Sequence, residues 1–344
     1  MEPTLALLQG LALPIEWQKL RVGRAGIEAF GEAFPEESRR GIDAADATLF
    51  GATSGLSAGA IFYLRWGKET FANVRPARWR PGYRSPLARP EGVDLVIVRE
   101  NLEDLYVGVE GEIEELAPLA FESRTAGRPV SDYAPGRFAL KVISEAGSER
   151  VIRFAFELAR RRRAAGRAGR VTCSSKYNML PQSDGLFREI ALGVADDYPD
   201  IELMTLIVDD LAQRLVTQPH ELDVVVLPNL YGDILSDLAA GAIGGLGLAP
   251  SGCYGADYAY FESAHGSAPD IAGRGIINPT ATILSAAMML DYLGFEEAAT
   301  RLERAVTTVF ARGSALPRDQ GGDATTIGFC DAIARALDAP TGDA

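Results

Sequence analysis

The chain of 344 residues is 47% hydrophobic and 24% charged, which is enough apolar sequence for a substantial core and argues against wholesale disorder. Its formal net charge of −13 argues against a broad grip on nucleic acid, but leaves room for a local basic pocket that binds an anionic metabolite. Two histidines exclude a histidine-rich metal site, and no apolar run reaches the roughly 18 residues of a membrane span.

Cysteine and lysine usage add two expectations. The three cysteines lie far apart without disulfide or zinc spacing, which predicts a reducing, cytoplasmic compartment. The opening MEPTLALLQGLALPIEW has no basic segment and is not typical of a signal peptide. Arginine supplies most of the positive charge, and the only lysines are Lys19, Lys68, Lys141 and Lys176. A GC-rich genome explains that bias, but each of the four lysines is a candidate for a specific role.

The first half of the chain alternates helical and extended patterns. Helical periodicity is found over 4–13, 36–46 and 57–70. Extended patterns predict a short buried strand running into a glycine turn at 49–55, a strand over 71–79 broken at Pro76, and a strand over 94–101 covered on both faces. The irregular segment 111–140 suits a protruding hairpin or arm.

The second half continues the alternation, which predicts an α/β fold. The expected elements are an arginine-rich helix over 144–164, a strand over 171–175, a helix from about 183, a strand over 223–229 that leads into a helix, a glycine-rich stretch over 241–252, and helices over 279–293 and 295–312. The chain opens with a helix instead of the usual buried strand. Either the fold begins with a helix or the start is assigned too late.

Acidic residues gather in two places. Asp233 and Asp237 in YGDILSD share one face of the expected helix, and Asp209 and Asp210 follow the apolar LIV at a strand end. Carboxylates crowded together repel unless a cation joins them, and three oxygen ligands suit Mg²⁺ or Mn²⁺. The alternative is a solvated acidic helix face.

Three arginines recur in YLRWGKE, NVRPAR and VIVREN, namely Arg65, Arg75 and Arg99. Arg99 ends an apolar strand, where an unpaired guanidinium is costly to bury. Converging arginines would bind a di- or tricarboxylate through bidentate pairs, whereas ordinary surface ion pairing is the alternative. Lys176 and Tyr106 could move protons as base and acid near a bound substrate. Taken singly, an exposed lysine and a core tyrosine explain these two residues equally well.

The polar segment 262–273, ESAHGSAPDIAG, is bounded by turn-forming residues and can present backbone N–H groups to phosphates. Asp270 within it could accept both hydroxyls of an adenosine ribose, a device that favours NAD. The G-x-G-x-x-G fingerprint is missing, so a conventional Rossmann fold is not supported. The alternative is a plain surface loop.

Six segments together resemble the β-decarboxylating dehydrogenases, which act on isocitrate, 3-isopropylmalate, homoisocitrate or D-malate/tartrate. The segments are LRWGKETFANVRP, VIVRENLEDLYVGVE, SKYNMLPQSDGLF, VDDLAQRLV, NLYGDILSDLAAG and HGSAPDIAGRGIINPTATILSAAMML. They occur in family order, and the resemblance as a whole covers roughly residues 20–335. The resemblance implies NAD-dependent, metal-dependent oxidative decarboxylation of a substituted (R)-malate-type acid.

The resemblance also assigns roles to matching residues. Arg65, Arg75 and Arg99 match the arginines that bind the malate-core carboxylates, with Asn178 beside the site. Tyr106 matches the tyrosine that protonates the enol or enolate, and Lys176 matches the lysine that helps remove the hydroxyl proton. The metal residues are implied to be Asp233, Asp237 and, from a second subunit, Asp209. Lys176 is also expected to come from that partner, so an obligate homodimer with shared active sites is implied.

For the cofactor, the resemblance implies NAD together with Mg²⁺ or Mn²⁺. Asp270 matches the ribose-binding aspartate, and Asn278 matches the adenine-contacting asparagine. An aspartate repels a 2′-phosphate, so NAD is expected rather than NADP. The full set expected to contact the cofactor is Glu262, His265, Gly266, Ser267, Ala268, Asp270 and Asn278.

Departures from the family pattern concern the substrate and the first strand. Gly59 and Ile61 stand where isocitrate-specific members carry a serine and an asparagine. In the isopropylmalate pattern, Ala58 replaces an acid, and Ile61 and Phe62 replace two leucines. The apolar pair suits an alkyl or small substituent, but RENLEDLYVGVE is closer to isocitrate dehydrogenases, so the substituent stays open. The family's opening strand and its I-P-G-D-G-I-G-P-E loop are missing, which again suggests a late start.

The implied fold has two lobes with parallel and mixed sheets covered by helices. Residues 1–70 and 244–344 would form the cofactor-side lobe, and 71–243 the dimerisation and metal-site lobe with the arm near 111–140. The alternatives are a catalytically silent regulatory subunit of a hetero-oligomeric isocitrate dehydrogenase, and a plain NAD-binding or acidic interaction module.

Overall fold

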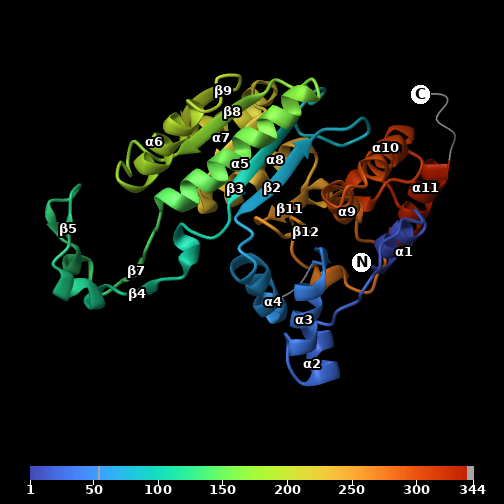
Figure 1. Cartoon of the computed structure of the whole chain (residues 1–344), viewed down its shortest axis with the longest axis horizontal. Helices are drawn as coiled ribbons and strands as arrows, with labels where there is room; N and C mark the ends of the chain where they lie inside the picture. The colour runs from blue at the N-terminus through green and yellow to red at the C-terminus, as the bar shows by residue number, and fades with distance from the viewer. Residues whose placement is uncertain (53–54, 339–344) are drawn as a thin grey trace.

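The computed structural model describes residues 1–52 and 55–338. At its centre lies one eight-stranded mixed sheet, in the order β1-β12-β11-β2-β3-β10-β8-β9 (Figure 1). The strands are β1 (Ala47–Phe50), β2 (Ala72–Arg78), β3 (Asp94–Glu100), β8 (Arg170–Ser175), β9 (Glu202–Ile207), β10 (Val224–Leu227), β11 (Pro250–Tyr254) and β12 (Ala259–Ser263). Strands β3, β10, β8 and β9 are parallel to one another, whereas β2 runs antiparallel to both β3 and β11.

Helices cover both faces of the sheet, which confirms the predicted α/β fold. They are α1 (Glu2–Gln9), α2 (Arg24–Phe30), α3 (Glu36–Ala44), α4 (Ala58–Phe62), α5 (Glu145–Ala164), α6 (Ser183–Ala195), α7 (Val208–Thr217), α8 (Asn229–Ile243), α9 (Thr280–Tyr292), α10 (Glu296–Arg312) and α11 (Thr326–Asp338). None of the helices within the described residues is long and apolar enough to cross a bilayer.

The apolar run predicted as a strand over 94–101 corresponds to β3, one of the central strands. Alternate side chains of β3 point to opposite faces of the sheet. Val98 joins a core cluster with Ile152 and Phe156 of α5, and Ile97 joins another with Leu235 of α8. Strand β3 is therefore buried on both sides, as predicted, and it delivers Arg99 and Glu100 to the buried edge where α8 begins.

Two predicted elements need correction. Strand β2 continues through Pro76 instead of breaking there, because β11 pairs only with residues 72–74 and leaves the next part of that edge free. The helix expected over 57–70 is short: α4 passes into a wider helical turn over Tyr63–Gly67. Thr53 and Ser54 of the predicted glycine turn lie outside the described residues.

The predicted arm is present. Strand β4 (Glu110–Glu112) pairs with β7 (Arg137–Ala139), and β5 (Glu122–Ser123) pairs with β6 (Arg128–Pro129). The segment extends away from the central sheet (Figure 1) and carries exposed apolar side chains, among them Leu119 and Phe121. The division into two lobes stays a prediction, since one sheet runs through both and one core cluster contains residues of each.

Candidate active site

Strands β2 and β3 bring two of the predicted arginines to the first turns of α8. Arg99, only 1% exposed, forms an ion pair with Asp233 and donates from Nε to Asn229 Oδ1 at 2.8 Å. Arg75 Nη1 lies 3.3 Å from both Asp233 and Asp237 and donates to Ser236 Oγ at 2.8 Å. Adjacent strands thus supply the cations and one helix supplies the carboxylates. We call Arg75, Arg99, Tyr106, Asp233 and Asp237 the substrate corner.

Tyr106 completes this corner. Its hydroxyl donates to Asp233 Oδ2 at 2.7 Å, and the Arg99 guanidinium lies 5.0 Å from its ring centroid. Burial and the hydrogen bond to Asp233 raise the pKa of the Tyr106 hydroxyl above its ordinary value, so the phenol stays protonated at neutral pH. A proton donor is therefore held at the metal-site carboxylate predicted from the sequence.

The charged groups of the substrate corner shift one another's pKa values. Burial, together with neighbouring Arg75, lowers the pKa of Arg99 to about 10, which still leaves the side chain charged at neutral pH. Burial alone would raise the pKa of Asp233, but Arg99 and Arg75 outweigh it and hold that pKa below its ordinary value. For Asp237, burial wins and its pKa is raised. The two helix carboxylates are therefore electrostatically distinct.

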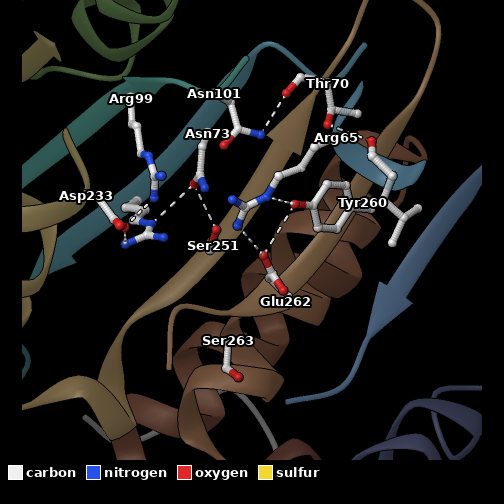
Figure 2. A network of polar contacts seen from close by, with 12 residues as sticks. Arg65, Thr70, Asn73, Arg99, Asn101, Asp233, Ser251, Tyr260, Glu262 and Ser263 are labelled. Atoms are coloured by element: carbon white, nitrogen blue, oxygen red, sulfur yellow. Dashed lines mark hydrogen bonds and ion pairs between the residues drawn. The ribbon is translucent and has the colours of Figure 1, made fainter. Parts of the chain in front are cut away.

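The third arginine, Arg65, belongs to a separate group of hydrogen-bonded side chains, which Figure 2 shows. Arg65 donates from Nε to the Tyr260 hydroxyl at 3.1 Å and lies 3.7 Å from Glu262, while the Tyr260 hydroxyl donates to Glu262 at 3.3 Å. Tyr260 is fully buried. Glu262, which was expected to contact the cofactor, thus pairs with a substrate-side arginine at the end of β12.

Buried amides and hydroxyls support the arginines. Asn73 on β2 accepts from Ser251 Oγ at 2.9 Å, and the same oxygen lies 3.4 Å from Arg75 Nε. The Nη2 atom of Arg99 and the Nδ2 atom of Asn73 are buried without a hydrogen-bond partner in the described part of the chain. Buried donors without partners are costly, so a ligand with acceptor oxygens fits this place.

The predicted metal ligands are only partly brought together. Asp233 and Asp237 lie one turn apart on α8 with partly exposed side chains, and carboxylate oxygens are the donors that Mg²⁺ and Mn²⁺ prefer. Asp209, in the first turn of α7, instead contacts Lys176. Within residues 1–52 and 55–338 of one chain, no group of three acidic, histidine or cysteine side chains is placed to hold a metal ion.

Lys176 follows β8 and makes its side-chain ion pair with Asp209, while Asp210 pairs with Arg214 at 3.2 Å. No hydrogen bond or ion pair between described residues joins Lys176 to the substrate corner. Asn178 is exposed just beyond Lys176. Lys176, Asn178 and Asp209 therefore form a second group of predicted site residues.

The predicted cofactor loop lies beyond β12. Gly266, Ser267, Ala268 and Asp270 are exposed, and His265 is partly exposed. Asn278 differs, because it is buried and its side chain is engaged within the protein. Its Nδ2 donates to Asp319 at 2.9 Å and its Oδ1 accepts from Thr280. An adenine contact by the Asn278 amide is untested and stays a prediction.

Known proteins are similar to this chain over nearly its whole length. The family profile described as isocitrate/isopropylmalate dehydrogenase matches residues 5–334. A 3-isopropylmalate/3-methylmalate dehydrogenase from Methanocaldococcus jannaschii is 43% identical over 97% of this chain and 93% of its own. An isocitrate/homoisocitrate dehydrogenase from Thermus thermophilus is 46% identical over 96% of this chain and 92% of its own. The chain belongs to the isocitrate/isopropylmalate dehydrogenase family.

A solved structure supports the same fold. The crystal structure of isocitrate dehydrogenase from Methylococcus capsulatus matches with a TM-score of 0.84 and 38% identity, over 98% of this chain and 94% of that one. The chain is therefore an oxidoreductase of a family of decarboxylating dehydrogenases that use NAD or NADP. The names of its relatives cover several acids, so family membership alone does not choose the substrate.

In this dehydrogenase the residues expected to face the substrate's side group differ in burial. Ile61 is partly buried against a small core cluster, whereas Phe62 is 58% exposed and stands edge-on to Trp66 at 5.4 Å. Both lie on α4, one turn before Arg65. Phe62 is thus the more accessible of the two for an apolar substituent.

Sequence reasoning missed the residues that support the site. Ser251 lies on β11 and Tyr260 on β12, and neither segment was predicted as a strand. Asn229 was placed in the strand over 223–229 but is the first residue of α8, because β10 ends at Leu227, and Ser236 lies in the predicted helix without any separate signal. Tyr260 contacts an arginine 195 positions away, so only the sheet order brings them together. The one available signal was the polar content of otherwise apolar segments.

Proposed function

We propose that this protein catalyses NAD-dependent, divalent-metal-dependent oxidative decarboxylation of an (R)-malate-type 2-hydroxy acid. The observation that carries the proposal is the convergence of Arg75, Arg99 and Tyr106 on Asp233, with a buried Arg99 donor that has no hydrogen-bond partner within residues 1–52 and 55–338. Two guanidinium groups fit two carboxylates through bidentate pairs. The substrate's own carboxylates would take the positions that the aspartates occupy around the arginines.

The chain's own residues account for binding and proton movement. Arg65, Arg75 and Arg99 orient the acid so that its hydroxyl-bearing carbon faces the cofactor loop. Tyr106 keeps its proton at neutral pH and delivers it to the carbon that loses CO₂. Lys176, which contacts Asp209, matches the lysine that helps to remove the proton of the substrate hydroxyl. Each group thus has one task at one atom.

Asp233, Asp237 and Asp209 of a second subunit would hold Mg²⁺ or Mn²⁺, which supplies Lewis-acid polarisation of the substrate oxygens when bound. The loop from His265 to Asp270 would hold NAD, with the Asp270 carboxylate accepting the ribose hydroxyls and repelling a 2′-phosphate. Asp270 is exposed and free to do so. All three cysteines are free and buried, which fits a reducing, cytoplasmic setting.

We propose further that two identical chains share each active site. The proposal is supported by the separation of Lys176 and Asp209 from the substrate corner in contacts within one chain. Inactive Lys176→Ala and Asp233→Asn chains would then complement each other. After random exchange, we expect turnover near about one quarter of the wild-type value, because one site in each mixed dimer carries neither change. Mixtures as inactive as their components would contradict sharing.

The test of the function is NADH formation with Mn²⁺, NAD and a panel of isocitrate, 3-isopropylmalate, homoisocitrate, D-malate and tartrate. Turnover of at least one acid is expected, and the preferred acid identifies the group that Phe62 accepts. Matched assays with NADP test the role of Asp270. A folded dimer that is silent with every acid would contradict the proposal and favour the regulatory-subunit alternative.

A further inference from the structure

Lys141 lies between β7 and α5 and is one of only four lysines in the chain. Its side chain is 15% exposed, and its ammonium lies 2.6 Å from Asp184 and 3.5 Å from Asp104, two carboxylates that are fully buried. The same ammonium is 4.3 Å from the ring centroid of Tyr231. One ammonium therefore compensates the charges of two buried carboxylates, which would otherwise lower the stability of the fold.

The two carboxylates are each bonded to backbone that carries a predicted catalytic group. Asp104 accepts the N–H of Leu105 at 2.9 Å and the N–H of Leu230, in the first turn of α8, at 3.0 Å. It does so with φ at +67°, a conformation that few non-glycine residues adopt. Asp104 therefore joins the turn that holds Tyr106 to the helix that holds Asp233.

Asp184 holds the backbone of the other predicted catalytic residue, Lys176. Its Oδ2 accepts the backbone N–H of Lys176 at 2.7 Å, and its carbonyl accepts the Ser175 hydroxyl at 3.0 Å. The end of β8, from which the Lys176 side chain projects, is thus fixed through Asp184. Without a neighbouring cation, Asp184 would be a buried charge at the place where that backbone must be held.

We propose that Lys141 is a positioning residue for the reaction, whose ammonium holds Asp104 and Asp184 in place and thereby fixes Tyr106 and Lys176 together. This inference rests on the proposed function. If two chains share each site, Lys141 supports Tyr106 of its own site and Lys176 of the partner's site. A single buried cation then sets the geometry of acid and base in both.

The residue type supports this role. The chain uses arginine for nearly all of its positive charge but has lysine here. A compact ammonium can approach two carboxylates and an aromatic face at once, whereas a planar guanidinium is larger and forms directed pairs. We therefore expect the network to require the compact ammonium of lysine, so that a positive charge on a guanidinium does not replace it.

The test compares Lys141→Met with Lys68→Met. Lys68 is a matched control, because it is 18% exposed and lies 2.7 Å from Asp43 and 4.8 Å from the Tyr258 ring centroid, neither of which is a predicted site residue. Amide hydrogen exchange is measured on the full-length protein at Leu105, Lys176 and Leu230. We expect about tenfold faster exchange at these amides in K141M and no change in K68M.

Kinetics give the second readout, using the panel acid that the wild type turns over fastest. In K141M we expect kcat to fall by at least about tenfold while KM for the acid stays within about threefold, because the arginines are untouched. In K68M both constants should stay within about twofold. Folded K141M with wild-type exchange at Lys176 and Leu230 would overturn the inference, even if the wild type turned over none of the acids.

A second variant covers the case in which K141M is recovered only unfolded. Lys141→Arg keeps the positive charge, so we expect folded protein in which the larger head displaces the two carboxylates. Exchange at Lys176 and Leu230 should then still quicken. Exchange and kcat equal to those of the wild type in K141R would contradict the requirement for an ammonium.

Discussion

The substrate corner and the cofactor loop (residues 264–271) are built in opposite ways. In the substrate corner, the buried arginines of β2 and β3 form ion pairs with partly exposed aspartates of α8, and Arg99 is almost inaccessible. In the cofactor loop, most side chains are exposed, and the hydrogen bonds are largely local, such as His265 Nδ1 to Gly266 at 3.0 Å. The fold therefore preorganises the proposed acid-binding corner, whereas local contacts account for most of the hydrogen bonds of the proposed cofactor loop.

Asp233→Asn is expected to have the largest effect. It removes a metal donor and the carboxylate that Arg75, Arg99 and Tyr106 share, so kcat at saturating Mn²⁺ should fall by at least about 100-fold. Asp210→Asn is the control, since its partner Arg214 lies on the same helix and away from the corner. Equal activity of the two variants would show that Asp233 is not central.

Tyr106→Phe tests proton delivery inside the same corner. Loss of the hydroxyl should lower kcat by about 100-fold while KM for the acid stays within about threefold, because the arginines still bind the carboxylates. Tyr133→Phe in the exposed arm is the control. A rise in KM with unchanged kcat would assign Tyr106 to substrate binding instead.

Asp270→Asn tests the other region. Because Asp270 is exposed, its removal should leave the free energy of unfolding unchanged. KM for NAD should rise by about tenfold and KM for the acid should not change, since one charge-assisted contact is lost. Asp257→Asn, also exposed, is the control. An unchanged NAD preference over NADP would contradict the assigned role of Asp270.

Glu100 gives the smallest expected effect, and it concerns stability. Its side chain is 2% exposed and accepts the N–H groups of Leu102 and Glu103, both at 2.8 Å, but burial outweighs these bonds and raises its pKa to about 7. A carboxyl whose pKa is higher in the folded chain binds its proton more tightly there. Its contribution to stability is therefore present at acidic pH and lost as pH rises through about 7.

Glu100→Gln removes that titration. Urea unfolding at about pH 5 and about pH 8 should show a smaller loss of stability with rising pH in E100Q than in the wild type. Glu145→Gln, at the exposed start of α5, is the control and should keep the wild-type slope. The same slope in all three proteins would contradict a raised pKa for Glu100.

Much of this architecture was predictable from the sequence because local patterns carry it. The buried run of β3 ends in Arg99, and the spacing of Asp233 and Asp237 places both on one face of α8. These local patterns place each side chain on its element, but only the family resemblance joined the arginines to the aspartates in one site, since the contacts of Arg99 and Arg75 with α8 cross 134 and 161 residues of sequence.

The parts that could not be predicted depend on long-range packing. Tyr260 on β12 contacts Arg65 only because of the strand order, in which β11 lies between β12 and β2. Nothing in the local pattern of β12 indicates that order. From the sequence, Pro76 suggested a break, because proline has no N–H to donate to a neighbouring strand. The local pattern does not reveal that β11 pairs only with residues 72–74 and so does not require that N–H. Lys141 was notable only for its rarity, and its role emerges when Asp104 and Asp184 are seen to meet around it.

The central claim is that the substrate corner serves oxidation coupled to loss of CO₂. Its most direct test measures NADH and CO₂ together while the wild-type protein consumes the preferred acid of the panel with Mn²⁺. We expect one NADH and one CO₂ for each acid consumed, and neither product in D233N or after chelation of the metal. NADH without CO₂, or equal rates with and without the metal, would contradict the account.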